Sequence, residues 1–235
     1  MTASVRCFVA LFFAIACASS SSQTGVATRD QATVRRAPIA VDRSEAEIKR
    51  FEELDRATPP APGGIVFVGS SSIRMWKSLE SDFPNLPVMN RGFGGSTFPE
   101  AIHYLSRIVL PYKPRTIVVY EGDNDLTFGW GPRQVADDYR TFVRMVRDSL
   151  PNAKIVFISL KPSPSRWKLV DQQREANRLV RAIVSGDPLQ SYVDVFTPML
   201  GANGRPTPEL FVSDSLHMTP AGYAIWRARV APQVR

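Results

Sequence analysis

The chain has 235 residues, 44% of them hydrophobic, which fits one domain with its own core plus some additional segments. Its formal net charge of +7 favours contact with anionic surfaces such as membranes or polysaccharides. The positive charge is spread over many arginines rather than gathered in one run, so the composition argues against nucleic acid as a partner.

Residues 1–18 are typical of an export signal. A positively charged start, MTASVR, precedes the apolar run CFVALFFAIACA at 7–18, which is too short to span a bilayer comfortably. Two processing routes fit this segment. Ala16 and Ala18 are placed for cleavage after residue 18, whereas AIAC resembles a bacterial lipobox that would make Cys17 the lipidated first residue. We therefore expect an exported bacterial protein that is periplasmic, anchored to the outer membrane, or secreted.

Residues 19–62 are predicted to form a linker that contains one helix. The linker begins without hydrophobic periodicity and is rich in Ser, Thr and Arg. SEAEIKRFEELDRAT then predicts an amphipathic helix near 44–57, with Ser44 as N-cap and Glu47 completing a capping box. PPAPGG ends this helix, and the main domain is predicted at 63–235. Neither cysteine of the chain lies beyond residue 18, so we expect no disulfide in the domain.

Within the main domain, short β-branched runs alternate with helical patterns. Strands are predicted at 65–68, 87–90, 116–120, 154–160 and 192–196. Helices are predicted over 132–150, over about 168–185 and from Thr219 onward. Strands that alternate with helices form parallel sheets covered on both faces. The predicted fold class is therefore α/β, with a central parallel sheet of about five strands.

Polar, glycine-rich segments follow the predicted strands at the edge where a parallel sheet binds its ligands. GSSS follows the first strand, NRGFGGST the second and EGDNDL the third, while SDSLHM ends the long loop after the last strand. The residues able to do chemistry are therefore expected at one edge of the sheet.

Two histidines are candidates for that chemistry. His217 follows Asp214 by three positions, a spacing at which the carboxylate can accept a hydrogen bond from Nδ1–H and leave Nε2 free as a base. His103 lies in a helical pattern and is expected at the surface. A metal site is disfavoured because the Asp-x-x-His pair supplies too few ligands. The phosphate-loop motif G-x-x-x-x-G-K is absent.

The serines of GSSS have two interpretations. Hydroxyls that follow a strand often cap the next helix, and GFGG and Asn124 could belong to simple turns. The combination of a hydroxyl, a base, an orienting carboxylate and amide donors at one edge favours serine hydrolysis instead. The common elbow motif G-x-S-x-G is absent, because the residue two positions after Ser71 is Ile73.

These segments resemble the blocks of the SGNH, or GDSL-type, hydrolases. GSSSIRMW is similar to the block that holds the nucleophile and a following tryptophan. NRGFGGST is similar to the glycine block, GDND to the Gly-x-Asn block and DSLH to the Asp-x-x-His block, together covering roughly residues 65–231. The resemblance implies a flavodoxin-like three-layer α/β/α sandwich, without a cofactor or a catalytic metal.

Carried onto this chain, the resemblance makes Ser71 the nucleophile, His217 the general base and Asp214 its orienting partner. The oxyanion hole would consist of the N–H groups of Ser71 and Gly95 and the side-chain amide of Asn124. In the glycine block, the residue before Gly95 is also a glycine and could serve in its place.

The nucleophile block departs from the family pattern at one position. Ser70 stands where the family usually has aspartate, so three serines compete for the role. Aligning Gly69 with the family glycine and Trp76 with its tryptophan selects Ser71, whereas Ser70 or Ser72 would need a shift of one residue.

The sequence thus predicts an exported serine esterase that hydrolyses small acyl esters through an acyl-serine intermediate. Acetylated carbohydrates, lysophospholipids and short-chain lipids are the expected substrates. An acyltransferase that passes the acyl group to a cell-envelope carbohydrate is the nearest alternative. A non-catalytic exported module that binds polysaccharide or lipid is disfavoured, since it needs no such set of groups. The expected contacts are the ester substrate and, if Cys17 is lipidated, a membrane.

Overall fold

The computed structural model describes residues 1–2 and 41–235. The predicted export signal after Thr2, both of its processing routes and the linker through residue 40 lie outside the described residues. In the part of the chain that is described, no helix is both long and apolar enough to cross a membrane.

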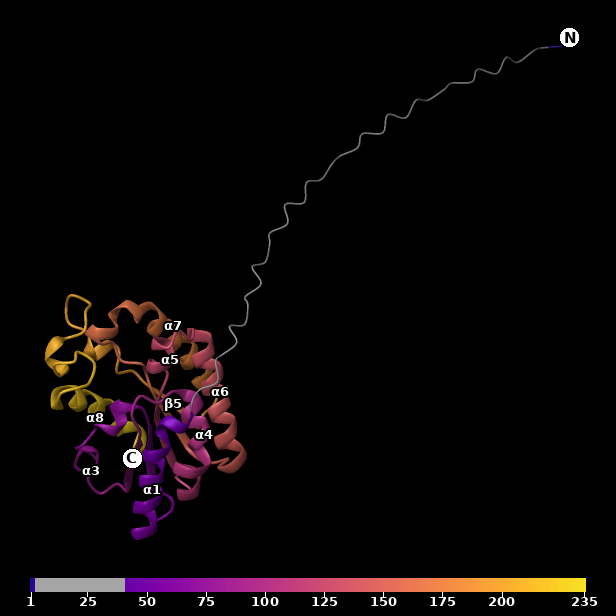
Figure 1. The fold of residues 1–235 in the computed structure, drawn as a ribbon. Helices are drawn as coiled ribbons and strands as arrows, with labels where there is room; N and C mark the ends of the chain where they lie inside the picture. Colours follow the sequence, from indigo (N-terminus) through magenta and orange to yellow (C-terminus); the bar gives the residue numbers. More distant parts are fainter. Residues whose placement is uncertain (3–40) are drawn as a thin grey trace. The chain divides into compact units, whose positions relative to one another are not determined.

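The domain is built on a five-stranded parallel sheet, which confirms the predicted α/β class (Figure 1). The strands are β1 (Ile65–Gly69), β2 (Val88–Gly92), β3 (Thr116–Tyr120), β4 (Lys154–Ile158) and β5 (Gln190–Val193). Their order in the sheet is β2-β1-β3-β4-β5. The chain therefore crosses from one side of β1 to the other between β2 and β3. Such a switch point opens a crevice at the carboxyl ends of the strands, where ligands bind.

The last strand ends earlier than the sequence predicts. We expected a strand over 192–196, but β5 ends at Val193. The N–H groups of Val195 and Phe196 donate to Oγ of Ser159 at 3.0 and 3.2 Å. Two consecutive N–H groups that donate to one side-chain oxygen do not alternate as they do in a strand, so the strand ends before them.

Helices cover both faces of the sheet. They are α1 (Glu45–Ala57), α2 (Ser71–Arg74), α3 (Leu79–Asp82), α4 (Phe98–Ile108), α5 (Asp123–Thr127), α6 (Pro132–Ser149), α7 (Val170–Val184) and α8 (Pro220–Val234). The three helices that the sequence predicts in the main domain form as α6, α7 and α8. Helices α4, α6 and α7 pack side by side, whereas α3 and α8 lie on the opposite face (Figure 1). Helix, sheet and helix therefore make the three layers that the resemblance implied.

Aromatic side chains fill the space between the layers. Phe67 lies in register with Val118, and Phe157 with Val119, so these two phenylalanines point to opposite faces of the sheet. One face gathers the rings of Phe67, Trp76, Phe83, Tyr223 and Trp226, and the other those of Phe98, Tyr139, Phe142 and Phe157. This packing holds the strands, and hence the loops at their carboxyl ends, in fixed positions.

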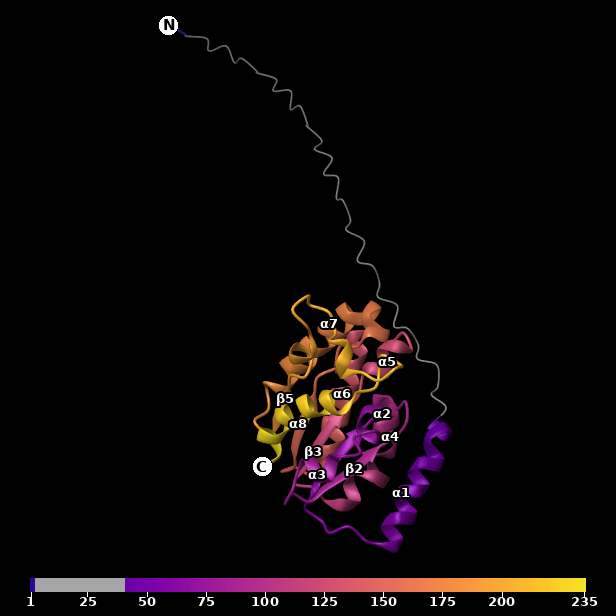
Figure 2. The ribbon, with the colours of Figure 1, turned by 90° about the vertical axis from the view of Figure 1, so that its left-hand side faces the viewer.

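Helix α1 belongs to the same compact unit as the sheet and packs against α4, although we expected it within a linker (Figure 2). Ile48 of α1 is fully buried in the core. The predicted capping box is wrong. Ser44 precedes the helix, but its hydroxyl donates to the buried carboxylate of Glu100, and Glu47 accepts the N–H of Gly94. Both side chains thus bond to partners from distant parts of the chain instead of to the backbone at the start of their own helix.

Candidate active site

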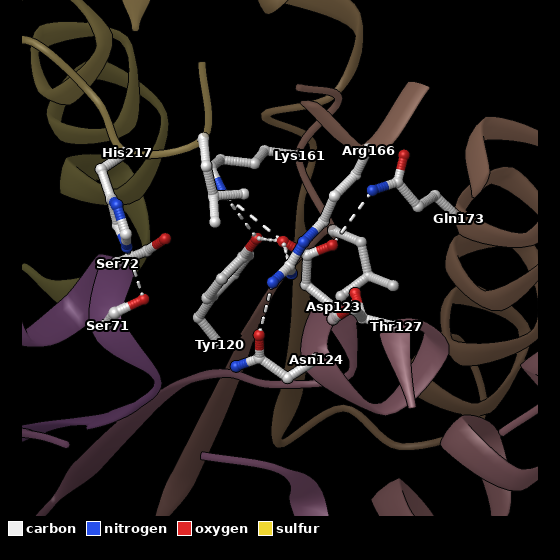
Figure 3. Close-up of polar contacts among 12 residues, drawn as sticks. Ser71, Ser72, Tyr120, Asp123, Asn124, Thr127, Lys161, Arg166, Gln173 and His217 are labelled. Atoms are coloured by element: carbon white, nitrogen blue, oxygen red, sulfur yellow. Dashed lines mark hydrogen bonds and ion pairs between the residues drawn. The ribbon is translucent and has the colours of Figure 1, made fainter. Parts of the chain in front are cut away.

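Three side chains form a hydrogen-bonded line at the carboxyl edge of the sheet. Ser71 is the first residue of α2, which follows β1 after a single residue. Its Oγ lies 2.8 Å from Nε2 of His217, which stands on the loop before α8 (Figure 3). Nδ1 of His217 lies 2.5 Å from Oδ2 of Asp214. The fold thus brings together the hydroxyl, imidazole and carboxylate that the sequence analysis named.

Asp214 holds both the imidazole and the loop that carries it. Its Oδ1 accepts the N–H groups of Leu216 and His217 at 2.8 and 2.9 Å. Burial acts to raise the pKa of Asp214, but the hydrogen bonds from His217 and Leu216 outweigh it and lower this pKa to about 2. Asp214 is therefore ionised at neutral pH. An anionic acceptor at Nδ1 keeps the proton on that nitrogen and leaves the lone pair of Nε2 facing Ser71.

The three consecutive serines differ in their surroundings. Gly69 ends β1 with a φ of +151°, and a Cβ there would lie 2.3 Å from the carbonyl oxygen of Tyr120, so the turn into α2 requires glycine. Ser70 and Ser72 are both 3% exposed. Ser71 is more exposed and contacts His217. The geometry therefore singles out Ser71 among the three hydroxyls.

The side-chain amide of Asn124 has a fixed orientation. Its Oδ1 accepts a hydrogen bond from Nη2 of Arg166 at 2.7 Å, and its Nδ2 donates to the carbonyl oxygen of Ser96 at 2.8 Å. Because a guanidinium only donates, the oxygen of the amide must face Arg166. Figure 3 shows the nitrogen on the side of Asn124 that faces Ser71. Among the described residues, the second N–H of this nitrogen has no acceptor, so it can donate to a ligand.

The two adjacent glycines of the glycine block also differ. The N–H of Gly94 donates to Oε1 of Glu47 at 3.0 Å. Gly95 has a φ of +66°, and no atom lies within 4 Å of the position a Cβ would take. Within residues 41–235, the N–H of Gly95 has no hydrogen-bond partner. Gly95, rather than Gly94, therefore has a donor to offer to a ligand.

A buried group of polar side chains lies next to Asn124, on the side away from Ser71 (Figure 3). Asp123 lies 2.8 Å from Arg166 and 3.4 Å from Lys161, and it accepts a hydrogen bond from Gln173 at 3.1 Å. Burial acts to raise the pKa of Asp123, but the charges of Lys161 and Arg166 outweigh it, so that this pKa is lowered. Asp123 is therefore an anion that anchors Arg166 and, through Arg166, the amide of Asn124.

The sequence motifs did not indicate a role for Lys161 or Arg166. Their position could have indicated one, because the segment KPSPSR at 161–166 follows β4 at the same edge as the other polar loops. His103, expected at the surface, is exposed on α4. Among residues 41–235, no group of three His, Cys, Asp or Glu side chains is arranged to hold a metal ion.

The chain is similar to known acylhydrolases in sequence. Residues 66–225 match the model of the GDSL-like Lipase/Acylhydrolase family. Platelet-activating factor acetylhydrolase IB subunit alpha1 of Homo sapiens is 27% identical over 167 residues, which span 68% of this chain and 70% of that protein.

Two solved structures are similar in fold. A GDSL-like lipase from Bacteroides thetaiotaomicron superposes with a TM-score of 0.68 at 20% identity, covering 80% of this chain and 97% of that one. A catalytic mutant of an acetylxylan esterase from Geobacillus stearothermophilus superposes with a TM-score of 0.59 at 15% identity, covering 74% of this chain and 95% of that one. At these identities the likeness is one of fold, and it agrees with the three layers described above.

Proposed function

We propose that this chain, which belongs to the GDSL-like lipase/acylhydrolase family and is an ester-hydrolysing enzyme, acts through an acyl-serine intermediate at Ser71. The observation that carries this proposal is the line from Ser71 Oγ through the His217 ring to Asp214, with separations of 2.8 and 2.5 Å. Family membership removes the non-catalytic binding module from consideration.

In the first half of the reaction, Nε2 of His217 takes the proton of the Ser71 hydroxyl while Oγ attacks the ester carbonyl. The carbonyl π electrons move to the oxygen, which becomes the oxyanion of a tetrahedral intermediate. His217 then gives its proton to the leaving alcohol as the C–O bond breaks. Asp214 remains ionised throughout and stabilises the imidazolium that forms.

In the second half, a water molecule takes the place of the alcohol. His217 accepts a proton from the water as it attacks the acyl-serine, and it returns that proton to Oγ of Ser71 when the acid leaves. The N–H groups of Ser71 and Gly95 and the amide of Asn124 would donate to the oxyanion in both halves. Donors held in place before the reaction stabilise the developing charge without reorganisation.

Small acyl esters are the proposed substrates. Acetylated carbohydrates, lysophospholipids and short-chain lipids all present an unhindered ester carbonyl. The names of two similar proteins, a platelet-activating factor acetylhydrolase subunit and an acetylxylan esterase, support acetyl as the acyl group.

Export is proposed from the apolar run at 7–18. Lipidation of Cys17 would anchor the protein to a membrane, whereas cleavage after residue 18 would release it. Mass spectrometry of the N-terminal peptide of the mature protein distinguishes these routes, since lipidation leaves a diacylated cysteine as the first residue.

An acyl-ester panel tests the proposed activity. Purified protein would be given acetylated xylo-oligosaccharides, a lysophospholipid and short-chain triacylglycerols, with and without a carbohydrate acceptor. We expect release of free acid from at least the acetyl esters, and no turnover by Ser71→Ala. Transfer of the acyl group to the acceptor in preference to water would instead establish the acyltransferase alternative. Full activity of Ser71→Ala would contradict the assigned nucleophile.

A further inference from the structure

The segment that precedes the sheet holds the two peptide groups that flank the one between Gly94 and Gly95. Oε1 of Glu47, on α1, accepts the N–H of Gly94 at 3.0 Å. Nη2 of Arg43, just before α1, donates to the carbonyl oxygen of Gly95 at 2.8 Å. The peptide that carries the N–H of Gly95 lies between these two contacts.

The side chains of Arg43 and Glu47 are themselves fixed by further contacts. Nε of Arg43 donates to Oε1 of Glu100 at 2.7 Å, and its Nη2 pairs with the other oxygen of the same carboxylate. The guanidinium also lies 5.3 Å from the centre of the Phe128 ring. Oε2 of Glu47 lies 3.5 Å from Nη1 of Arg74. Both contacts to the glycines are therefore made by side chains with a second anchor.

The glycines need this support. A Gly-Gly pair has the widest conformational freedom of any dipeptide, and Gly95 has a φ of +66° with open space around the Cβ position. Without outside contacts, the plane of the intervening peptide could rotate and turn its N–H away from the site. An oxyanion donor is effective only if its direction is fixed before the charge develops.

We propose that Arg43 and Glu47 are positioning residues that fix the direction of the Gly95 N–H for catalysis. This inference rests on the proposed function, in which that N–H donates to the oxyanion. The segment from Arg43 to the end of α1, which the sequence pattern places in a linker, would then be a working part of the active site. It acts on the reacting atoms through the glycine block and not by touching the substrate.

A purely structural role is the competing explanation for Arg43. Glu100 is fully buried, and Arg43 supplies the positive charge beside it, so removing that charge is expected to destabilise the fold. Arg43→Lys keeps the charge beside Glu100 but loses the planar fork that reaches both Glu100 and Gly95. Glu47 has a more exposed carboxylate, with 37% of its side chain exposed, and its replacement leaves Glu100 paired.

The test compares Glu47→Ala and Arg43→Lys with Glu53→Ala, a matched control for an exposed glutamate of the same helix. We expect both test variants to lower kcat by roughly five- to twentyfold, less than the hundredfold or more that follows loss of an oxyanion donor. KM should stay within about twofold, because the support acts on the transition state. The control should match the wild type in both constants.

A trifluoromethyl ketone analogue of the substrate supplies a second measurement. It forms a tetrahedral adduct with an active serine and places an oxyanion at the site. Its inhibition constant should rise in both test variants by the same factor as kcat/KM falls, while the melting temperature remains near that of the control. A change in melting temperature and KM without a matching change in the inhibition constant would assign these residues a structural role and overturn the inference.

The same variants distinguish a failure of this inference from a failure of the proposed function. If Ser71→Ala is inactive but both test variants match Glu53→Ala, the inference is wrong and the assigned nucleophile stands. If Ser71→Ala retains full activity, the proposed function itself is wrong.

Discussion

Arg166 donates from Nη2 to Oδ1 of Asn124 at 2.7 Å, while Nη1 of the same guanidinium lies 2.8 Å from Oδ2 of Asp123. One planar group thus holds two consecutive residues at the start of α5. The ion pair to Asp123 fixes the guanidinium, and the guanidinium decides which end of the Asn124 amide faces Ser71 (Figure 3).

Replacing Asn124 with alanine should lower kcat on the order of a hundredfold or more, with little change in KM. The reason is that the amide would hydrogen-bond more strongly to the oxyanion than to the neutral ester. Steady-state kinetics on an acetyl ester measures both constants, and circular dichroism confirms that the variant is folded. Asp125→Ala is the comparison. A mild effect at Asn124 beside a severe effect at Asp125, in folded proteins, would reject Asn124 as an oxyanion donor.

Replacing Arg166 with methionine should lower kcat about tenfold, because the amide of Asn124 then keeps only its hydrogen bond to the carbonyl oxygen of Ser96 and is held less firmly. This loss should disappear in an Asn124→Ala background, where there is no amide to orient. A double-mutant cycle on kcat measures the coupling between the two residues. If Arg166→Met costs as much without Asn124 as with it, Arg166 acts by another route, such as direct contact with the substrate.

The burial of the Glu121 carboxyl group predicts that the stability of the folded protein depends on pH. Oγ of Ser96 hydrogen-bonds to Oε1 of Glu121, whereas Oε2 is buried with no hydrogen-bond partner among the described residues. Burial, reinforced by the charge of Asp125, raises the pKa of Glu121 well above its ordinary value. Above the ordinary pKa of about 4.3, the unfolded state therefore releases a proton that the folded state retains. Stability is lost as the pH rises toward the folded-state pKa.

The variant Glu121→Gln cannot ionise and should avoid this loss. We expect its urea midpoint to rise relative to the wild type between about pH 5 and about pH 8, where the wild type is increasingly destabilised. The exposed Glu53→Gln is the control, and its midpoint should differ from the wild type by the same amount at both pH values. A Glu121→Gln difference that is independent of pH would show that Glu121 is ionised in the folded protein.

The burial of Ile48 predicts that α1 contributes to the stability of the whole domain. Ile48→Ala should lower the free energy of unfolding by about 2–5 kcal/mol, as for other buried aliphatic truncations. Leu54→Ala on the same helix should cost no more than about 0.5 kcal/mol, because 53% of Leu54 is exposed. Urea denaturation measures both. Equal and small costs would mean that α1 is not an integral part of the domain.

The α/β class and the meeting of the polar segments at one edge of the sheet could be predicted from the sequence for a physical reason, whereas the resemblance to the SGNH hydrolases selected Ser71 among the three serines. In a parallel sheet, every strand delivers its carboxyl end to the same edge, so the loops that follow the strands meet whatever the strand order. The Asp-x-x-His spacing is local, and it lets Asp214 and His217 contact each other within one loop.

Contacts between distant segments could not be predicted in the same way. Glu47 meets Gly94 across 47 positions of the chain, and Arg166 meets Asn124 across 42. The sequence around Glu47 or Arg166 contains no pattern that indicates such a partner. The same limit explains the wrong capping box, since the Ser44 hydroxyl found a buried carboxylate 56 positions away instead of the backbone of its own helix.

Labelling with a fluorophosphonate probe, followed by peptide mapping, tests the central claim most directly. Such a probe forms a covalent bond with a serine Oγ that a neighbouring base has activated. The account predicts a single adduct on Ser71, lost in Ser71→Ala and in His217→Ala but kept in Ser70→Ala and Ser72→Ala. An adduct on Ser72 that persists in Ser71→Ala, or no adduct in protein that hydrolyses esters, would contradict it.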